Sequence, residues 1–270
     1  MHEIPGLRLA ESRPIDHPLT IMSRSTVYQQ DLAWIHHVGF GDFARGAGRE
    51  LLQSLRRGGV RGETLIDLGC GSGIWAAMAE RAGFRVVGVD RSAAMIALAK
   101  RESPKSEFVR ASLDEFPLPP CAAVTALGES FNYGAGTEAI DLRRLFARIA
   151  RALRPGGRFV FDVIIHEGEP MNYRTWRVGP VWALLVDVKE DRRRRTLARH
   201  IITFRTGDGR IRRSEEHHAV QCFRRAEVER ALRVSGFRFR VSRRYGRMPL
   251  APRRLAFIAT NPPRPARARR

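Results

Sequence analysis

The sequence contains little lysine, although it is strongly basic. Only three of its 48 basic residues are lysines (Lys100, Lys105 and Lys189), so the net charge of +20 comes almost entirely from arginine. A basic chain favours a nucleic acid or another anionic partner. These arginines are dispersed along the chain, however, as a GC-rich coding bias would leave them. Nucleic acid is therefore an alternative partner, and a small molecule is the leading interpretation.

Cysteine is also scarce, and long apolar runs are absent. Cys70, Cys121 and Cys222 have no CxxC spacing, so we expect neither a disulfide framework nor a zinc site, and no metal. No run of about 18 apolar residues could cross a membrane. The first residues lack the basic and then apolar order of a secretion signal. These features predict a cytoplasmic protein without a membrane partner.

A strand, a glycine-rich turn, a helix and a second strand are predicted over residues 63–90. Residues 64–68 form a short apolar run that stops at the turn 69–73, because glycine tolerates positive φ. Residues 74–81 are rich in alanine and favour a helix. The second strand ends at Asp90. A unit of this length places two parallel strands beside each other in an α/β domain.

The spacing of the glycines indicates which ligand the turn binds. A dinucleotide fingerprint that began at Gly69 would require glycine at position 74, where Ile74 stands. Residues 67–73 instead follow the pattern D-x-G-x-G-x-G. Glycine lets a ligand lie against bare backbone, and Asp67 offers an acceptor to a cationic group. Asp90 can accept hydrogen bonds from both hydroxyls of a ribose.

These residues resemble motif I, and the acidic position after it, of the class I S-adenosylmethionine (SAM) methyltransferases. The string LRPGGRFVFDV at 153–163 resembles a later motif of the same family. The resemblance implies an α/β fold with a Rossmann-like, doubly wound, seven-stranded sheet. It implies SAM as cofactor and S-adenosylhomocysteine as product. Ser112 stands where the family often has an acid. The cofactor-binding residues expected on this basis are Asp67, Gly69, Cys70, Gly71, Asp90, Arg91, Ser112, Leu113 and Leu127.

The rest of the chain fits one methyltransferase domain with additions. Residues 23–260 form this domain between a flexible arm (1–22) and a basic, disordered tail (261–270). Residues 23–60 are expected to form two covering helices, the second over 43–55, and 166–223 an antiparallel β insertion after strand five. The remaining elements are expected as strands at 106–111, 121–127, 158–163, 237–243 and 255–260 and helices at 138–153 and 225–235.

Methyl transfer from a sulfonium is an in-line displacement, so the enzyme mainly needs to orient its reactants. A base is needed only if the nucleophile must lose a proton. The candidate catalytic residues are Tyr28 and His36 on the first helix, Glu129 after strand four and His166 after strand five. Asn132 and Tyr133 are further candidates. In residues 215–218, two acids and two histidines alternate along a strand, and one of its faces is expected to line the acceptor pocket.

The sequence therefore predicts transfer of a methyl group from SAM to an oxygen or nitrogen atom of a small molecule. Two alternatives remain open. The chain could modify RNA through its basic surface, or it could be a SAM-binding module without catalysis. Neither the acceptor nor the oligomeric state follows from the sequence.

Overall fold

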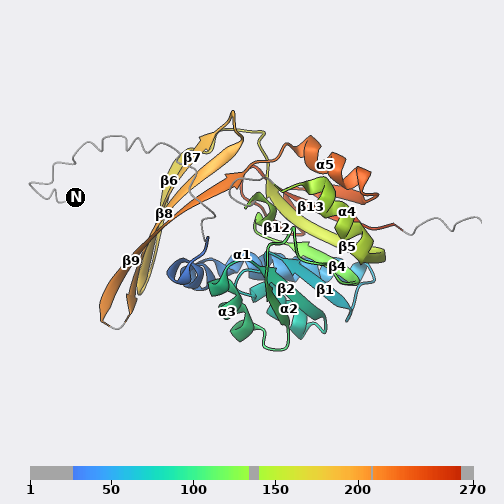
Figure 1. Ribbon diagram of the computed structural model, residues 1–270, viewed down its shortest axis with the longest axis horizontal. Helices are drawn as coiled ribbons and strands as arrows, with labels where there is room; N and C mark the ends of the chain where they lie inside the picture. The colour runs from blue at the N-terminus through green and yellow to red at the C-terminus, as the bar shows by residue number, and fades with distance from the viewer. Residues whose placement is uncertain (1–26, 134–139, 208, 263–270) are drawn as a thin grey trace, which may run out of the picture.

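The computed structural model describes residues 27–133, 140–207 and 209–262. A seven-stranded sheet with helices on both faces forms the core, and a four-stranded sheet projects from it (Figure 1). The expected arm (1–22), most of the expected tail (263–270) and the start of the helix predicted from residue 138 lie outside the described residues. Within the described ranges, no helix combines the length and apolarity needed to span a membrane.

The core sheet confirms the predicted Rossmann-like, doubly wound fold. Its strand order is β10-β13-β5-β4-β1-β2-β3, and β1 to β5 run parallel while β13 is antiparallel to β5. The order of the parallel strands reverses between β1 and β4, which is where α/β sheets bind their ligands. The strands are β1 (Thr64–Leu68), β2 (Arg85–Asp90), β3 (Glu107–Arg110), β4 (Cys121–Ala126), β5 (Leu153–Ile164), β10 (Arg238–Ser242) and β13 (Arg254–Thr260).

The helices form a layer on each face of this sheet (Figure 1). One layer contains α1 (Gln30–Arg57), α2 (Ile74–Arg81) and α3 (Ala93–Glu102), and the other contains α4 (Leu142–Ala152) and α5 (Arg225–Val234). Beneath α4, Phe146 packs with Phe131, Phe159 and Phe161 in an aromatic cluster. Phe131 belongs to a short 3-10 helix, η1 (Ser130–Asn132), which follows β4.

The two covering helices predicted before motif I are one continuous helix, α1. The prediction placed a break near residues 39–42, where glycines interrupt the helical pattern. These glycines serve close packing instead. A Cβ atom at Gly39 would lie 2.7 Å from the ring of Trp182, and one at Gly48 would lie 2.8 Å from the sulfur of Met78. Packing of α1 against the core and the insertion thus outweighs the low helix propensity of glycine.

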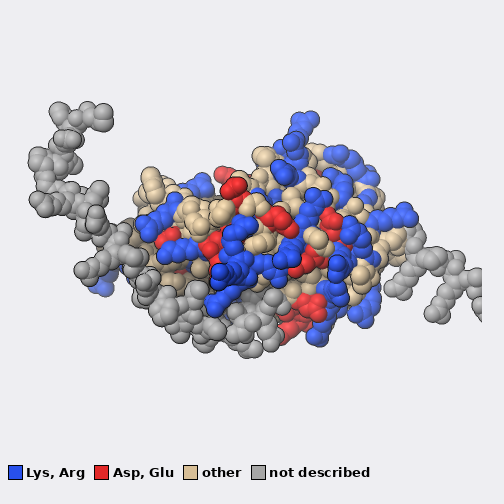
Figure 2. All heavy atoms as spheres, turned by 90° about the horizontal axis from the view of Figure 1, so that it is seen from above, with Lys and Arg blue, Asp and Glu red and all other residues tan. Residues whose placement is uncertain are grey.

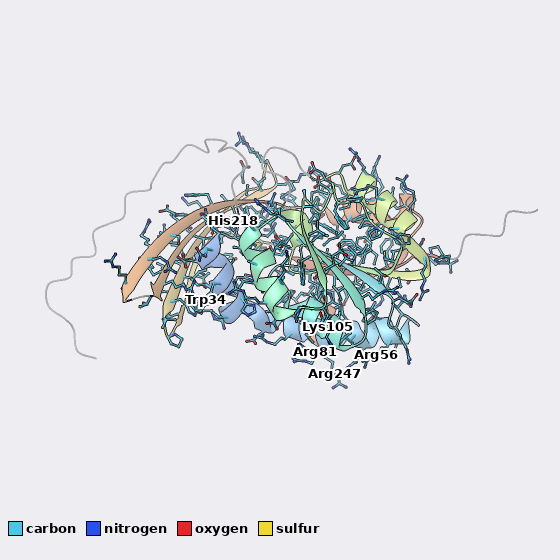
Figure 3. The ribbon with its side chains drawn as sticks, turned by 60° about the horizontal axis from the view of Figure 1, so that its bottom comes forward. Trp34, Arg56, Arg81, Lys105, His218 and Arg247 are labelled. Carbon is cyan, nitrogen blue, oxygen red and sulfur yellow. The ribbon has the colours of Figure 1, made fainter. Side chains whose placement is uncertain are left out.

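The insertion is a four-stranded antiparallel sheet of order β6-β7-β8-β9. Its strands are β6 (Tyr173–Gly179), β7 (Trp182–Asp191), β8 (Thr196–Gly207) and β9 (Arg210–Gln221). Edge strand β6 was not predicted, because its residues are exposed and show no apolar alternation. The inner face packs on the first turns of α1 through Leu32, Ile35, Trp182, Leu184 and Ile201. Figure 3 shows Trp34 and His218 at this junction, while Arg56 lies at the far end of α1.

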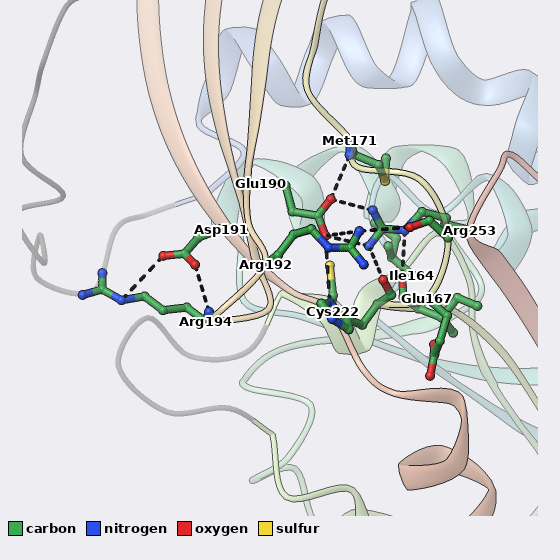
Figure 4. A network of polar contacts seen from close by, with 12 residues as sticks. Ile164, Glu167, Met171, Glu190, Asp191, Arg192, Arg194, Cys222 and Arg253 are labelled. Atoms are coloured by element: carbon green, nitrogen blue, oxygen red, sulfur yellow. Dashed lines mark hydrogen bonds and ion pairs between the residues drawn. The ribbon is translucent and has the colours of Figure 1, made fainter.

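One arginine ties the insertion to the core sheet (Figure 4). Arg253 immediately precedes β13, and its guanidinium contacts both oxygens of Glu190 on β7, at 2.6 and 2.9 Å. It also donates to the carbonyl oxygens of Ile165, His166 and Glu169. The Glu190 side chain is fully buried. A short hairpin formed by β11 (Arg244–Tyr245) and β12 (Met248–Pro249) completes the fold.

Candidate active site

A cavity of about 560 Å³ lies between the core sheet and the insertion, at the carboxyl ends of the parallel strands. One half is lined by the glycine-rich turn and the ends of β2, β3 and β4. The other half is lined by α1 and the inner faces of β6, β7 and β8. A single cavity therefore joins the predicted cofactor residues to the insertion.

The glycine-rich turn and Asp90 form one unit in the first half of the cavity. Gly71 has φ +53°, and a Cβ there would meet no atom within 4 Å, so the turn leaves open space for a ligand. The Gly71 N–H donates to Asp90 Oδ2 at 2.9 Å, and the Ser92 N–H donates to Oδ1 at 2.8 Å. Each carboxylate oxygen can still accept another hydrogen bond. Burial raises the pKa of Asp90.

Asp67 lies at the end of β1 beneath the same turn and is almost fully buried. Thr125 on β4 donates to Asp67 Oδ1 at 2.8 Å, and the Trp75 indole donates to the Thr125 hydroxyl at 2.9 Å. Burial is the main cause that raises the pKa of Asp67 to about 7, and the nearby charge of Asp90 adds to it. A cation bound beside Asp67 would stabilise its ionised form.

All the residues predicted to bind the cofactor line this cavity. Ser112 donates to Asp114, so the exit of β3 presents an acid two residues after the position where the family often has one. Their individual contacts with a cofactor stay predictions. The lining residues are Asp67, Gly69, Cys70, Gly71, Asp90, Arg91, Ser112, Leu113 and Leu127.

Tyr28 and His36 line the other half of the cavity. Tyr28 was predicted on the first helix but lies two residues before α1, in a left-handed conformation, and its N–H donates to Glu216 at 2.7 Å. Its ring meets the His36 ring edge-on at 5.2 Å, and its hydroxyl lies 3.3 Å from that of Tyr133. Burial raises the pKa of Tyr28 and lowers that of His36 to about 4. At neutral pH the phenol is protonated and the imidazole is neutral.

Glu129 follows β4 and enters the cavity between two arginines. Arg199 on β8 contacts one carboxylate oxygen at 2.8 Å, and Arg254 on β13 contacts the other. Arg199 also donates to the Tyr133 hydroxyl at 2.6 Å. Glu129 is buried and has φ +64°, a conformation that non-glycine residues rarely adopt. Both carboxylate oxygens of Glu129 are therefore engaged by guanidinium groups.

Asp162, near the carboxyl end of β5, supports the Glu129 conformation. Its carboxylate accepts from the N–H groups of Gly128 and Glu129 at 2.9 and 3.0 Å. It also accepts from the Tyr245 hydroxyl at 2.7 Å. Burial raises the pKa of Asp162 to about 7. Asp162 thus positions the segment that carries Glu129, although it does not line the cavity itself.

Three features differ from the expectations. His166 does not line the cavity; its Nδ1 lies 4.0 Å from Glu190 at the base of the insertion, away from the proposed chemistry. Asn132 binds backbone groups of Ile164 and Gln221 and joins η1 to the two sheets. Neither face of residues 215–218 lines the cavity, because Glu216 and His218 pack behind Tyr28.

The outer face of the same strand holds Glu215 and His217. With His200 on β8, they place three possible metal ligands within 4.8 Å of one another. Glu215 is already engaged at this surface, because it contacts His200 at 2.5 Å and also Arg213. This group lies on the face of the insertion directed away from the cavity.

Several residues in or beside the cavity had not been predicted. Arg199 and Arg254 come from strands far apart in the sequence, and nothing in the local pattern distinguishes them from the many other arginines. Asp162 did carry a signal, since it is a lone acid inside the apolar run FVFDV. Burying a carboxyl group without hydrogen-bond partners is unfavourable, so a lone acid in an apolar strand indicates that polar partners lie beside it.

The strand order, the position of the cavity and the acid at the end of β2 define a Rossmann-like fold of the methyltransferase type. Residues 65–157 match the family model described as a methyltransferase domain. A structure of a SAM-dependent methyltransferase from Clostridium acetobutylicum has a TM-score of 0.74 at 15% identity, with 86% of this chain and 98% of that chain covered. Residues 65–157 therefore form a methyltransferase domain of the class I type, whose methyl donor is SAM, and the fold of the chain is that of a SAM-dependent methyltransferase.

Two further proteins are similar over most of the chain. A dTDP-4-amino-2,3,4,6-tetradeoxy-D-glucose N,N-dimethyltransferase from Saccharopolyspora spinosa is 28% identical over 239 residues, which are 81% of this chain and 90% of that protein. The structure of the sugar N-methyltransferase KedS8 from Streptoalloteichus has a TM-score of 0.67 at 21% identity and covers 96% of this chain and 100% of that one.

Proposed function

We propose that the protein transfers a methyl group from SAM to a nitrogen or oxygen atom of a small molecule, with the amino group of a sugar as the leading acceptor. The observation that carries the proposal is the single cavity, which joins the glycine-rich turn to a wall formed by the insertion. Similarity to an amino sugar N,N-dimethyltransferase and to a sugar N-methyltransferase supports the nitrogen acceptor.

The chain's own residues suit an amine nucleophile. An amine attacks the sulfonium methyl only in its neutral form, and positive charges nearby lower the pKa of an amine. Arg199 and Arg254 supply two guanidinium groups. Glu129 and the partly ionised Asp162, 3.5 Å from Arg254, neutralise them only in part. An amine beside this cluster would therefore lose its extra proton more easily. The nucleophile would then need orientation more than a strong base.

Tyr28 and His36 are the residues that we assign to orientation and proton removal. A protonated Tyr28 can hold the nucleophile by a hydrogen bond, and a neutral His36 can accept the proton that the attacking group loses. Because the pKa of His36 is about 4, the imidazole is a weak base and suits an amine better than a hydroxyl. Glu129 anchors the arginines in this assignment.

Nucleic acid is the weaker alternative. Figure 2 shows Lys and Arg side chains spread over the visible face, with acidic and uncharged residues between them. Arginine also contributes much of the structural pairing, as at Arg253 with Glu190 and Arg154 with Glu63. A steep fall of RNA affinity with salt would favour this alternative.

The test is methyl transfer from labelled SAM to a panel of amino sugars and their hydroxyl analogues, read by mass of the product. We expect turnover with an amine and saturable binding of S-adenosylhomocysteine in calorimetry. The His36→Gln variant should lower kcat about tenfold with little effect on that binding. His217→Gln, an exposed histidine on the outer face of the insertion, is the control. Cofactor binding without turnover of any acceptor would instead favour a non-catalytic module.

A further inference from the structure

The inner face of edge strand β6 presents a row of polar side chains to the cavity. Tyr173, Thr175 and Arg177 alternate along the strand, and all three line the cavity. Their cross-strand partners on β7 are Val188, Val186 and Leu184. Among the described residues, none of these three polar side chains makes a hydrogen bond or an ion pair. The row is therefore available to a ligand.

Arg177 differs from the other arginines in the cavity. Arg91 donates to the carbonyl oxygen of Tyr133, and both Arg199 and Arg254 pair with Glu129. The Arg177 guanidinium instead lies 4.9 Å from the centre of the Phe40 ring. This contact orients the exposed side chain and leaves its five N–H donors unsatisfied within the described part of the chain, and these donors match the geometry of a carboxylate or phosphoryl group.

The register of the insertion sets the distance from Arg177 to the polar cluster around Glu129. Tyr173 shares a cross-strand row with Val188 and Arg199, whereas Arg177 lies two rows away, beside Leu184. Four residues along a strand span roughly 13 Å. The row between them contains Thr175, Val186 and Ile201, so the wall of this middle part is mainly apolar.

We propose that Arg177 binds an oxyanion of the acceptor, a phosphoryl or carboxylate group, roughly 13 Å along the strand from the Arg199 end of the cavity. This inference rests on the proposed function and specifies its substrate class. The acceptor would be elongated. It would carry its nucleophile near Tyr28, a less polar middle against Val186 and Ile201, and its oxyanion at Arg177. Tyr173 and Thr175 would donate hydrogen bonds to oxygen atoms along its length.

Charge in this half of the cavity supports an anionic acceptor. Arg177, Arg199 and Arg254 bring three positive charges, Glu129 brings one negative charge, and Asp162, which lies 3.5 Å from Arg254 and has a pKa of about 7, adds part of another. Bound SAM would add the positive charge of its sulfonium to the same cavity. An acceptor with an oxyanion would reduce this excess, whereas a purely cationic acceptor would increase it.

Binding of two simple probes tests the proposal without turnover. Protein saturated with S-adenosylhomocysteine is titrated with inorganic pyrophosphate and, separately, with malonate at ~150 mM salt, where long-range attraction is screened. We expect at least one probe to bind saturably and Arg177→Gln to weaken it about tenfold, as loss of a charge-assisted contact would. Binding of pyrophosphate alone would identify a phosphoryl group, and of malonate alone a carboxylate.

Arg174→Gln is the matched control, because Arg174 lies on the same strand but points to the outer face and pairs with Asp187. We expect it to leave probe affinity within about twofold. Equal losses in the two variants, or no saturable binding of either probe to the unmodified protein, would overturn the proposal. Failure of S-adenosylhomocysteine to bind would contradict the proposed function instead, and the probes can then be compared on the protein without it.

Discussion

The two halves of the cavity are built in different ways. The cofactor half is the part lined by the glycine-rich turn, and the acceptor half is the part lined by α1 and the insertion. In the cofactor half, the N–H groups of Gly71 and Ser92 donate to Asp90, and all three residues belong to one strand–helix–strand unit and the turn after it. In the acceptor half, the Glu129 carboxylate is held by Arg199 and Arg254, which come from β8 and β13. Backbone geometry thus fixes the first half, and side chains from distant strands fix the second.

This difference has a physical consequence for variation. The glycine-rich turn would bind the cofactor, which is the same whatever the acceptor. Most substitutions in this turn would disturb its backbone conformation. Side chains on an inserted sheet can change one at a time while the core sheet stays intact. The fold can therefore keep one methyl donor and exchange acceptors by varying the inner face of β6, β7 and β8.

The largest effect is expected where the insertion joins the core. Arg253→Met would leave the buried Glu190 carboxylate without its main partner and remove hydrogen bonds to three carbonyl oxygens. We expect a loss of about 3–5 kcal/mol in the free energy of unfolding, measured in urea. Arg192→Met is the control, since Arg192 lies 3.9 Å from Glu190 and is partly exposed. Equal losses would show that Arg253 has no special role at this junction.

The next effect tests the cofactor half. Asp90→Ala removes the acceptor for the Gly71 and Ser92 N–H groups and the predicted ribose contact. We expect S-adenosylhomocysteine affinity to fall about 100-fold, as lost charge-assisted hydrogen bonds would cause. Calorimetry measures it, with unfolding curves to confirm that the variant is folded. Unchanged affinity would contradict the ribose assignment, and Glu115→Ala, outside the cavity, is the control.

The pH dependence of cofactor binding tests the role of Asp67 in the same half of the cavity. Because the pKa of Asp67 is raised to about 7, its carboxyl is mostly protonated at pH 6 and mostly ionised at pH 8. The ammonium of S-adenosylhomocysteine favours the ionised form, so affinity should rise with pH and level off above about 7. We expect a change of about tenfold between pH 6 and 8. In Asp67→Asn this dependence should disappear; a persistent slope would assign it to another group.

The same division explains what the sequence could predict. Residues 63–90 and 153–163 carry motifs whose contacts are local, and the sheet, the switch point and the lining position of each cofactor candidate followed from them. The antiparallel β insertion over 166–223 was also predicted, because the chain does not continue the alternation of strands and helices there. Edge strand β6 and continuous helix α1 did not, because exposure removes the pattern in one and glycines needed for packing interrupt it in the other.

In the acceptor half, the sequence predicted individual residues of the site but not the contacts between them. Tyr28, His36 and Glu129 do line the cavity, but the pairing of Glu129 with Arg199 and Arg254 depends on the register between distant strands. His166 was predicted from its position after strand five, yet the chain turns there into the base of the insertion. Local sequence contains no information about which of many arginines reaches a given carboxylate.

The smallest expected effect comes from a substitution that tests whether acceptor binding and cofactor binding are independent. Leu184 and Leu185 are neighbours on β7 that point to opposite faces of the insertion, so Leu184 is buried against the cavity and Leu185 is 44% exposed. Leu184→Ala should raise the KM for an acceptor about fivefold, because about 1 kcal/mol of apolar contact is lost. Affinity for S-adenosylhomocysteine should not change, since Leu184 belongs to the acceptor half. Leu185→Ala should leave both constants unchanged. If Leu184→Ala weakened cofactor and acceptor equally, the two halves would not be independent.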